Sequence, residues 1–255
     1  RILTEQIPSF VAYKRLTKVL LLSILSLITT PLHSAGMWKW LTNMIRGIQF
    51  TKGDIYHICN KSIANYLIFN KDEDKLRFLS VLEYYNDKDN SQRFSYFLKT
   101  HSYSYQNLLI QPTRPSVKFI SFCIMRDHYH LLIKVVDEDI SRFLGIIESA
   151  YTRYFNIKYE RKGPLWQSRF RCVRVTTNEQ LLHVSRYIHL NPTTAKYVDK
   201  PEYWKYSSYY NFIRGQALKE LTEISIRNPK QYKKFCEDQI DYQQSLKIIK
   251  TELLE

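Results

Sequence analysis

The chain reads VKFISFCIM at residues 117–125 and HYHLLIKVV at residues 128–136, two apolar stretches separated only by Arg126 and Asp127. Both stretches are rich in β-branched and aromatic residues, and the polar break between them predicts a hairpin of two strands. Upstream, IYHICNK at Ile55–Lys61 alternates apolar and polar residues and predicts another strand. The middle of the chain therefore predicts an antiparallel sheet.

Three other stretches show the spacing of helices. Residues 72–85 (DEDKLRFLSVLEYY) place apolar side chains on one face and begin with acidic residues, as a helix N-terminus favours. Residues 140–159 carry apolar side chains at helical spacing. Residues 177–190 predict a helix that is capped by Thr177 or Asn178.

The order strand, helix, strand, strand, helix, strand is the split β-α-β pattern. It predicts an α+β fold of the ferredoxin-like type, an antiparallel sheet with helices on one face. Residues 94–99 are interpreted as a further short strand, and residues 107–116 as a loop because they contain two prolines. The charged segment after Gly215 predicts a C-terminal helical extension.

These features divide the chain into an N-terminal segment over residues 1–45, a main domain over residues 46–214 and a helical tail over residues 215–255. The first segment contains a short apolar run, VLLLSILSLI at residues 19–28, after basic residues. This run is about half as long as a membrane span and resembles a signal peptide.

The first methionine of the chain is Met37. We therefore interpret the apolar segment as upstream read-through before a start at Met37 or Met44. An export signal or anchor, and a genuine helix of the fold, are the alternatives.

The composition is strongly basic. Lys and Arg number 38 against 24 Asp and Glu, and the net charge of +14 favours a polyanionic partner. An apolar fraction of 44% excludes a disordered polyelectrolyte. The 6 glycines are too dispersed for a P-loop or a dinucleotide fingerprint, so we expect no nucleotide cofactor.

The cysteines stand far apart in the sequence. No C-x-x-C pair exists, which excludes zinc fingers and ribbons. Isolated cysteines fit a reducing compartment, so we expect a cytoplasmic protein that does not associate with membranes.

Two histidines, His128 and His130, flank Tyr129 in a predicted strand. Side chains two residues apart share one strand face, so both imidazoles point the same way. Such a pair can hold a divalent metal with positions left open for a substrate. The alternative is that the pair is structural.

Along the helix predicted at residues 177–190, His183, Tyr187 and Asn191 follow at intervals of four residues and share one face. Tyrosine supplies a hydroxyl nucleophile that can form a covalent phosphoester. Asn191 or His183 is placed to supply a third metal ligand. The alternative is packing, because the chain holds 20 tyrosines.

A basic stretch, RKGPLWQSRFRCVRV, spans residues 161–175 and contains no acidic residue. Positive charge interleaved with aromatic rings suits single-stranded nucleic acid, through phosphate neutralisation and base stacking. A solvated strand edge has a similar pattern. The predicted DNA-binding residues are Arg161, Lys162, Trp166, Arg169, Phe170, Arg171 and Arg174.

Together these motifs resemble a known family. MRDHYHLLI at residues 125–133, GPLWQSRF at residues 163–170 and RYIHLNPTTA at residues 186–195 are similar to the REP-associated tyrosine transposases. Those are single-tyrosine HUH transposases of bacterial insertion sequences. GDIYHICNK at residues 53–61 adds to the resemblance, which covers residues 46–214 in the family's motif order.

The resemblance implies a metal-dependent nuclease and strand transferase that acts on single-stranded or hairpin DNA. His128 and His130 match the family's histidine pair, and Asn191 matches a third polar ligand of Mg²⁺ or Mn²⁺. Tyr187 matches the nucleophile that forms a 5′-phosphotyrosine during DNA transposition. The family includes dimers as well as monomers, so a homodimer is an open possibility.

Two features depart from the family. Tyr129 stands where the family has an aliphatic residue, and the pair Arg126-Asp127 replaces the usual Pro-Asn. No catalytic group is removed. A domesticated, non-catalytic protein that binds single-stranded DNA or RNA hairpins is therefore an alternative. A small-molecule phosphohydrolase is a third, which the net charge of +14 disfavours.

Overall fold

The computed structural model describes residues 49–137, 139–215, 223–226 and 228–245. The predicted N-terminal segment and its interpretation lie outside these residues. The elements, in chain order, are β1 (Ile55–Lys61), α3 (Asp72–Asn86), α4 (Phe94–Thr100), β2 (Val117–Ile124), β3 (His128–Val135), α5 (Ile140–Lys158), β4 (Arg171–Val175), α6 (Asn178–Thr194), α7 (Tyr209–Ile213) and α8 (Pro229–Glu237), with 3-10 turns at Ile63–Asn65 and Pro201–Tyr203.

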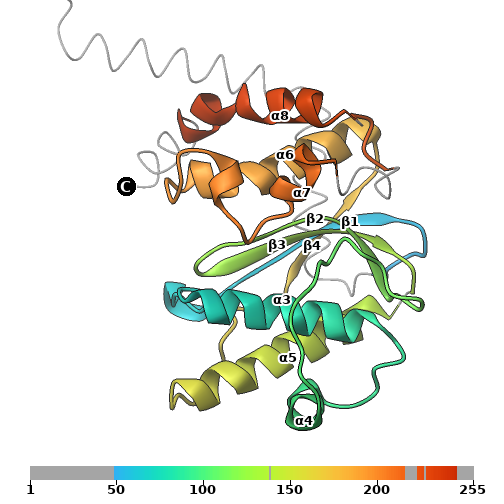
Figure 1. Cartoon of the computed structure of the whole chain (residues 1–255), viewed down its shortest axis with the longest axis vertical. Coiled ribbons are helices and arrows are strands. Elements are labelled where there is room, and N and C mark those ends of the chain that lie inside the picture. The colour runs from blue at the N-terminus through green and yellow to red at the C-terminus, as the bar shows by residue number, and fades with distance from the viewer. Residues whose placement is uncertain (1–48, 138, 216–222, 227, 246–255) are drawn as a thin grey trace, which may run out of the picture. The chain divides into compact units, whose positions relative to one another are not determined.

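The strands form a sheet in the order β2-β3-β1-β4, and every neighbouring pair is antiparallel. Helices α3 and α5 lie together on one face of the sheet (Figure 1). This order and these two helices are the ferredoxin-like arrangement, so the predicted fold is confirmed.

The opposite face of the sheet is covered by α6, with α7 beside it and α8 beyond it (Figure 1). Thr177 caps α6, as predicted, and its hydroxyl accepts a hydrogen bond from the Gln180 amide. Buried His189 joins the three helices, because Nδ1 bonds to the Tyr232 hydroxyl and Nε2 to the Ser208 hydroxyl, both at 2.8 Å. Burial lowers the pKa of His189 to about 3.

An aromatic core fills the space between the sheet and the layer of α3 and α5. The ring of Phe78 lies 5.0 Å from that of Tyr129 and 5.1 Å from that of Tyr151. Trp166 joins this cluster at 5.6 Å from Tyr129, and its indole N–H donates to the Glu148 carbonyl. Packing of large rings in one cluster supplies much of the apolar burial that holds this layer together.

Residues 94–99, interpreted above as a strand, form helix α4 instead. Phe94 and Phe97 are three residues apart, and a helix turns both toward Tyr84 of α3, at ring distances of 4.8 and 5.0 Å. Contact with α3 therefore decides the local structure.

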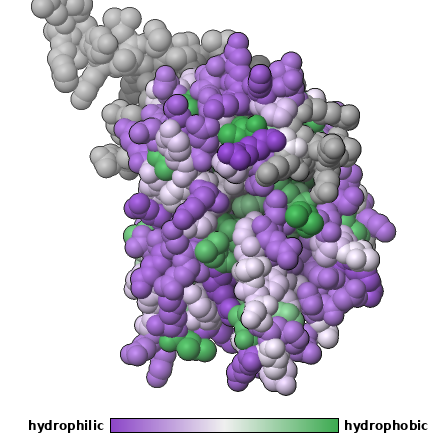
Figure 2. Space-filling view, in the orientation of Figure 1, coloured by the Kyte–Doolittle hydropathy of each residue, from purple (hydrophilic) through white to green (hydrophobic). Residues whose placement is uncertain are grey.

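Polar and charged side chains cover most of the surface seen in Figure 2, and hydrophobic ones lie in small separate groups. Among the described residues, no helix is both long enough and apolar enough to cross a membrane.

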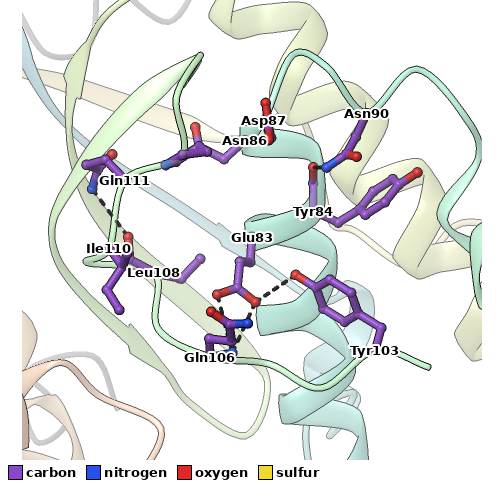
Figure 3. A pocket seen from close by; sticks show the side chains of 11 residues that line it. Glu83, Tyr84, Asn86, Asp87, Asn90, Tyr103, Gln106, Leu108, Ile110 and Gln111 are labelled. Carbon is purple, nitrogen blue, oxygen red and sulfur yellow. Dashed lines mark hydrogen bonds between the residues drawn. The ribbon is translucent and has the colours of Figure 1, made fainter. Parts of the chain in front are cut away.

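The connection from α4 to β2 is held by Glu83 (Figure 3). Its carboxylate accepts hydrogen bonds from the Tyr103 hydroxyl at 2.7 Å and from the backbone amides of Gln106 and Asn107. This region borders a cavity of about 240 Å³. The Glu83 carboxylate forms its hydrogen bonds with residues of this connection. We therefore interpret the cavity as a space left where the connection is attached to α3.

Candidate active site

A row of four residues crosses the sheet. The strand register places Cys123 opposite His130, His130 opposite Cys59, and Cys59 opposite Arg171. Directly opposed residues share a face of the sheet. The His130 ring contacts Tyr187 of α6, so the row lies on the face that α6 covers.

His57 joins this row from β1, two residues before Cys59. Its Nε2 lies 3.0 Å from Nδ1 of His130, and the two rings are stacked. The potential ligand atoms of His57, Cys59 and His130 all lie within 4.8 Å of one another. These three side chains form the imidazole–thiol cluster, which contains two nitrogen donors and one sulfur donor.

The second nitrogen of His130, Nε2, is buried and has no hydrogen-bond partner among the described residues. A buried polar atom without a partner is costly unless something binds it. Burial lowers the pKa of His57 to about 4, and burial with the neighbouring imidazoles holds the pKa of His130 well below its usual range. Both rings are therefore neutral at neutral pH, the form that binds metals, so the cluster fits a metal ion.

His128 lies next to this cluster, with its ring 5.0 Å from that of His130 and nearly perpendicular to it. Its Nδ1 lies 2.6 Å from Oδ1 of Asp127, and Lys61 Nζ lies 3.3 Å from the other carboxylate oxygen. Burial would raise the pKa of Asp127, but the hydrogen bond from His128 and the charge of Lys61 outweigh it and lower that pKa. The Asp127 carboxylate is thus ionised and holds the His128 ring by one nitrogen.

Tyr187 projects from α6 over the histidines. Its ring lies edge-on, 5.5 Å from the ring of His130 and 6.1 Å from that of His57. The residue is 44% exposed, which leaves the ring accessible to a polymer substrate. Partial burial raises the pKa of the phenol, so the hydroxyl is protonated at neutral pH.

Asn191 lies one turn after Tyr187 and is half-buried. Its side-chain amide donates to the Tyr187 carbonyl at 2.9 Å, which leaves its oxygen available as a ligand. His183, the other candidate for a third ligand, is placed differently. Its Nδ1 accepts from Arg186 at 2.8 Å, and its ring lies 6.0 Å from Phe235 near α8.

The predicted DNA-binding stretch divides into different environments. Arg171 is exposed on the face of the imidazole–thiol cluster, opposite Cys59. Arg174 pairs with Asp54 at 2.7 Å on the other face. Arg161 folds back onto its own turn and donates to the Pro164 carbonyl at 2.6 Å.

The remaining members of that stretch also differ in exposure. Lys162 and Arg169 are exposed, and the Phe170 ring lies 6.4 Å from that of Phe50. Trp166 packs in the aromatic core, where its ring contacts protein on several sides. Of the predicted DNA-binding residues, Arg171 is the one whose pairing with Cys59 puts it beside the imidazole–thiol cluster.

Sequence reasoning missed His57 and Cys59. The signal was present in the alternation of IYHICNK, because residues 57 and 59 share a face of the strand. The pairing of β1 with β3 brings that face beside His130, and this register was not deducible from one strand alone.

A family model described as "Transposase IS200 like" matches residues 92–191, a segment that contains His128, His130, Tyr187 and Asn191. This segment is therefore similar to the IS200-like transposases. A curated protein of Haemophilus influenzae with the provisional name REP-associated tyrosine transposase is 26% identical over 112 residues. That alignment covers 40% of this chain and 64% of the relative, so the chain spans less than two thirds of the relative's length.

Two solved structures are also similar. One is a REP-associated tyrosine transposase bound to a REP hairpin, with a TM-score of 0.48 and 14% identity over 66% of this chain and 84% of that one. The other is a transposase candidate from Deinococcus radiodurans, with a TM-score of 0.32 and 15% identity over 56% of this chain and 94% of that one.

Proposed function

We propose that this chain is a metal-dependent endonuclease and strand transferase for single-stranded DNA, and that Tyr187 is its nucleophile. The observation that carries the proposal is the position of the Tyr187 phenol, edge-on to His130, whose buried Nε2 has no partner among the described residues. A tyrosine hydroxyl can act as a nucleophile in phosphoryl transfer, and a metal ion on a neighbouring nitrogen would stabilise the charge that develops on the phosphate. The family match to residues 92–191 supports the same reaction class.

We propose that His128, His130 and Asn191 hold the divalent ion. Asp127 accepts from Nδ1–H of His128, and we assign the shared proton of the His57–His130 pair to Nδ1 of His130. Both histidines then present an unprotonated Nε2. Metal-binding histidines commonly donate their other ring N–H to such a partner, which sets the tautomer and the ring orientation.

An ion held by these residues would supply positive charge against the scissile phosphate. Tyr187 Oη attacks the phosphorus, loses its proton to solvent at its exposed edge, and forms a phosphotyrosine with the 5′ end of the strand. The bond to the 3′ oxygen breaks and leaves a 3′-hydroxyl. Attack of a 3′-hydroxyl on the phosphotyrosine reverses the step, so no nucleotide cofactor is consumed.

The exposed guanidinium of Arg171 is placed to contact a phosphate of the strand beside the cluster. The substrate class that we propose is DNA whose single strands fold into hairpins, in keeping with the family resemblance. A transposase that moves such DNA is the biological role that follows.

The test is to incubate the protein with end-labelled single-stranded DNA from its own flanking repeats and Mn²⁺, and to look for a covalent adduct on a denaturing gel. Tyr187→Phe removes only the hydroxyl and is expected to abolish cleavage and adduct. Tyr210→Phe is the matched control, because Tyr210 is also partly exposed (39%) but lies on α7. An adduct that persists in Tyr187→Phe would contradict the assignment, and a parent protein that binds DNA without any adduct would favour the non-catalytic alternative.

A further inference from the structure

A groove lies on the layer of the molecule that faces away from Tyr187. It is formed between α3, α4 and α5 and encloses a cavity of about 410 Å³. Of these, α3 and α5 cover the face of the sheet opposite α6 (Figure 1). Four of its lining residues are cationic and none of its described lining residues is acidic; the cations are Arg77, Arg93, Arg153 and Lys158.

Most of this positive charge has no counter-charge. Lys158 is neutralised by Glu73 at 2.6 Å and Asp74 at 2.7 Å. Arg93 and Arg153 are exposed and form no ion pair with any residue that the structure describes. Uncompensated arginines at the edge of a cavity attract an anion, and the planar guanidinium suits phosphate in particular.

Arg77 packs against two aromatic rings at the groove. Its guanidinium carbon lies 4.5 Å from the centre of the Phe94 ring and 5.0 Å from that of Tyr154. Its Nε is buried and without a hydrogen-bond partner among the described residues. The Tyr154 ring, which is half-buried, offers a stacking surface for a base beside the arginines that suit phosphates.

The groove continues along the chain into the basic stretch that the sequence singled out. Ile157, which is 79% exposed, lines the groove near the end of α5. The turn after it is fixed to α5, because the Arg161 amide donates to the Asn156 carbonyl at 2.8 Å. The basic residues Arg161 and Lys162 therefore follow in the chain shortly after the residues that line the groove.

We propose that this arginine groove binds single-stranded DNA outside the segment that is cut, with phosphates on Arg93 and Arg153 and a base against Tyr154. The proposal rests on the proposed function only in taking DNA as the ligand, and it does not depend on Tyr187 as nucleophile. It predicts that the protein holds its substrate on two layers, the α6 face where cutting occurs and the α3–α5 face where the strand is gripped.

The test uses a fluorescein-labelled single-stranded oligonucleotide of mixed sequence, with fluorescence anisotropy measured in EDTA at several salt concentrations. Chelation removes cleavage from the measurement, so a failure of the Tyr187 assignment leaves this result unaffected. The double variant Arg93→Gln/Arg153→Gln is expected to bind more weakly. The slope of log affinity against log salt should fall by about 0.7 for each phosphate contact that is lost.

Arg114→Gln/Arg142→Gln is the matched control. It removes the same charge from exposed arginines that lie outside the groove and pair with Asp89 and Asp139. Equal affinities and slopes in the two double variants would overturn the proposal, because net charge alone would then explain binding.

Ultraviolet cross-linking followed by mass spectrometry provides an independent readout. Cross-links on the peptides that carry Arg93 or Tyr154 support the groove. Cross-links confined to peptides of α6 and β4 would overturn it.

Discussion

Nε2 of His57 and Nδ1 of His130 lie 3.0 Å apart, on adjacent strands and on the same face of the sheet. This contact fixes the His130 ring and leaves its other nitrogen, Nε2, buried without a partner among the described residues. His57 is therefore placed to act on a metal ion through His130, as a positioning residue.

His57→Leu is expected to weaken Mn²⁺ binding about 10- to 100-fold, because loss of the hydrogen bond frees the His130 ring and its tautomer. His57→Gln keeps a hydrogen-bonding group at this position and should recover part of the affinity. Isothermal titration with Mn²⁺ measures both variants. Equal affinity for the parent protein and His57→Leu would show that His57 does not position the ligand.

Asp127 is expected to have the same role toward His128. Asp127→Ala removes the acceptor for Nδ1 of His128 and should lower Mn²⁺ affinity by a similar factor, whereas Asp127→Asn retains an acceptor oxygen and should lose less. Asp89→Ala is a control on an exposed surface pair with Arg114. If Asp127→Ala and Asp89→Ala bind Mn²⁺ equally well, the carboxylate serves only the pairing with Lys61.

The sequence predicted the sheet and the helices well because their signals are local. Alternation marks β1, and the apolar runs on either side of Arg126-Asp127 mark β2 and β3. The pairing of His128 with His130 on one face followed from the period of a strand alone. Placing Tyr187 over that face required in addition that α6 cross it, which the family resemblance implied and periodicity did not.

Other features depend on contacts between distant segments. Trp166 is flanked by basic residues and suggested a stacking surface, and its half-buried ring also packs against Phe78, Tyr129 and Tyr151, a contact that the sequence did not show. The imidazole–thiol cluster likewise exists only because β1 pairs with β3 in one register. A single sequence contains each half of such a contact without showing that the halves meet.

Folding stability is expected to fall as the solution is acidified, because buried His189 remains neutral in the folded protein. Burial lowers its pKa from 6.5 to about 3, so below pH 6.5 the unfolded chain binds a proton that the folded protein does not. The contribution of His189 to the free energy of unfolding is therefore constant above pH 6.5. Below that pH it decreases by up to about 1.4 kcal/mol per pH unit.

Thermal melts of the metal-free protein between neutral and mildly acidic pH measure this decrease. His189→Gln offers an amide to the Tyr232 and Ser208 hydroxyls but takes up no proton, so its melting temperature should depend less on pH. Tyr232→Phe retains the titrating histidine and serves as the control. Parallel pH profiles for the parent and His189→Gln would assign the acid sensitivity to other groups.

Zn²⁺ is expected to inhibit the Mn²⁺-supported reaction by occupying the imidazole–thiol cluster. Two neutral imidazoles and a thiol within 4.8 Å of one another are ligands that select Zn²⁺, whereas Mg²⁺ and Mn²⁺ favour oxygen donors. His130 belongs both to this cluster and to the proposed site with His128 and Asn191. An ion held by Cys59 therefore withdraws His130 from the site that serves the phosphate.

Cys59→Ser separates the two sites, because serine removes the sulfur ligand and leaves His128, His130 and Asn191 in place. Cobalt(II) reports the difference directly, since a bound thiolate produces a charge-transfer absorption that nitrogen and oxygen ligands do not. The parent protein should show this absorption and be inhibited by Zn²⁺, and Cys59→Ser should lose both while it retains cleavage with Mn²⁺. Cys236→Ser is the control, because Cys236 is buried in α8 away from the cluster. Zn²⁺ inhibition that persists undiminished in Cys59→Ser would show that the thiol takes no part, and the donor set around His130 would then contain no sulfur.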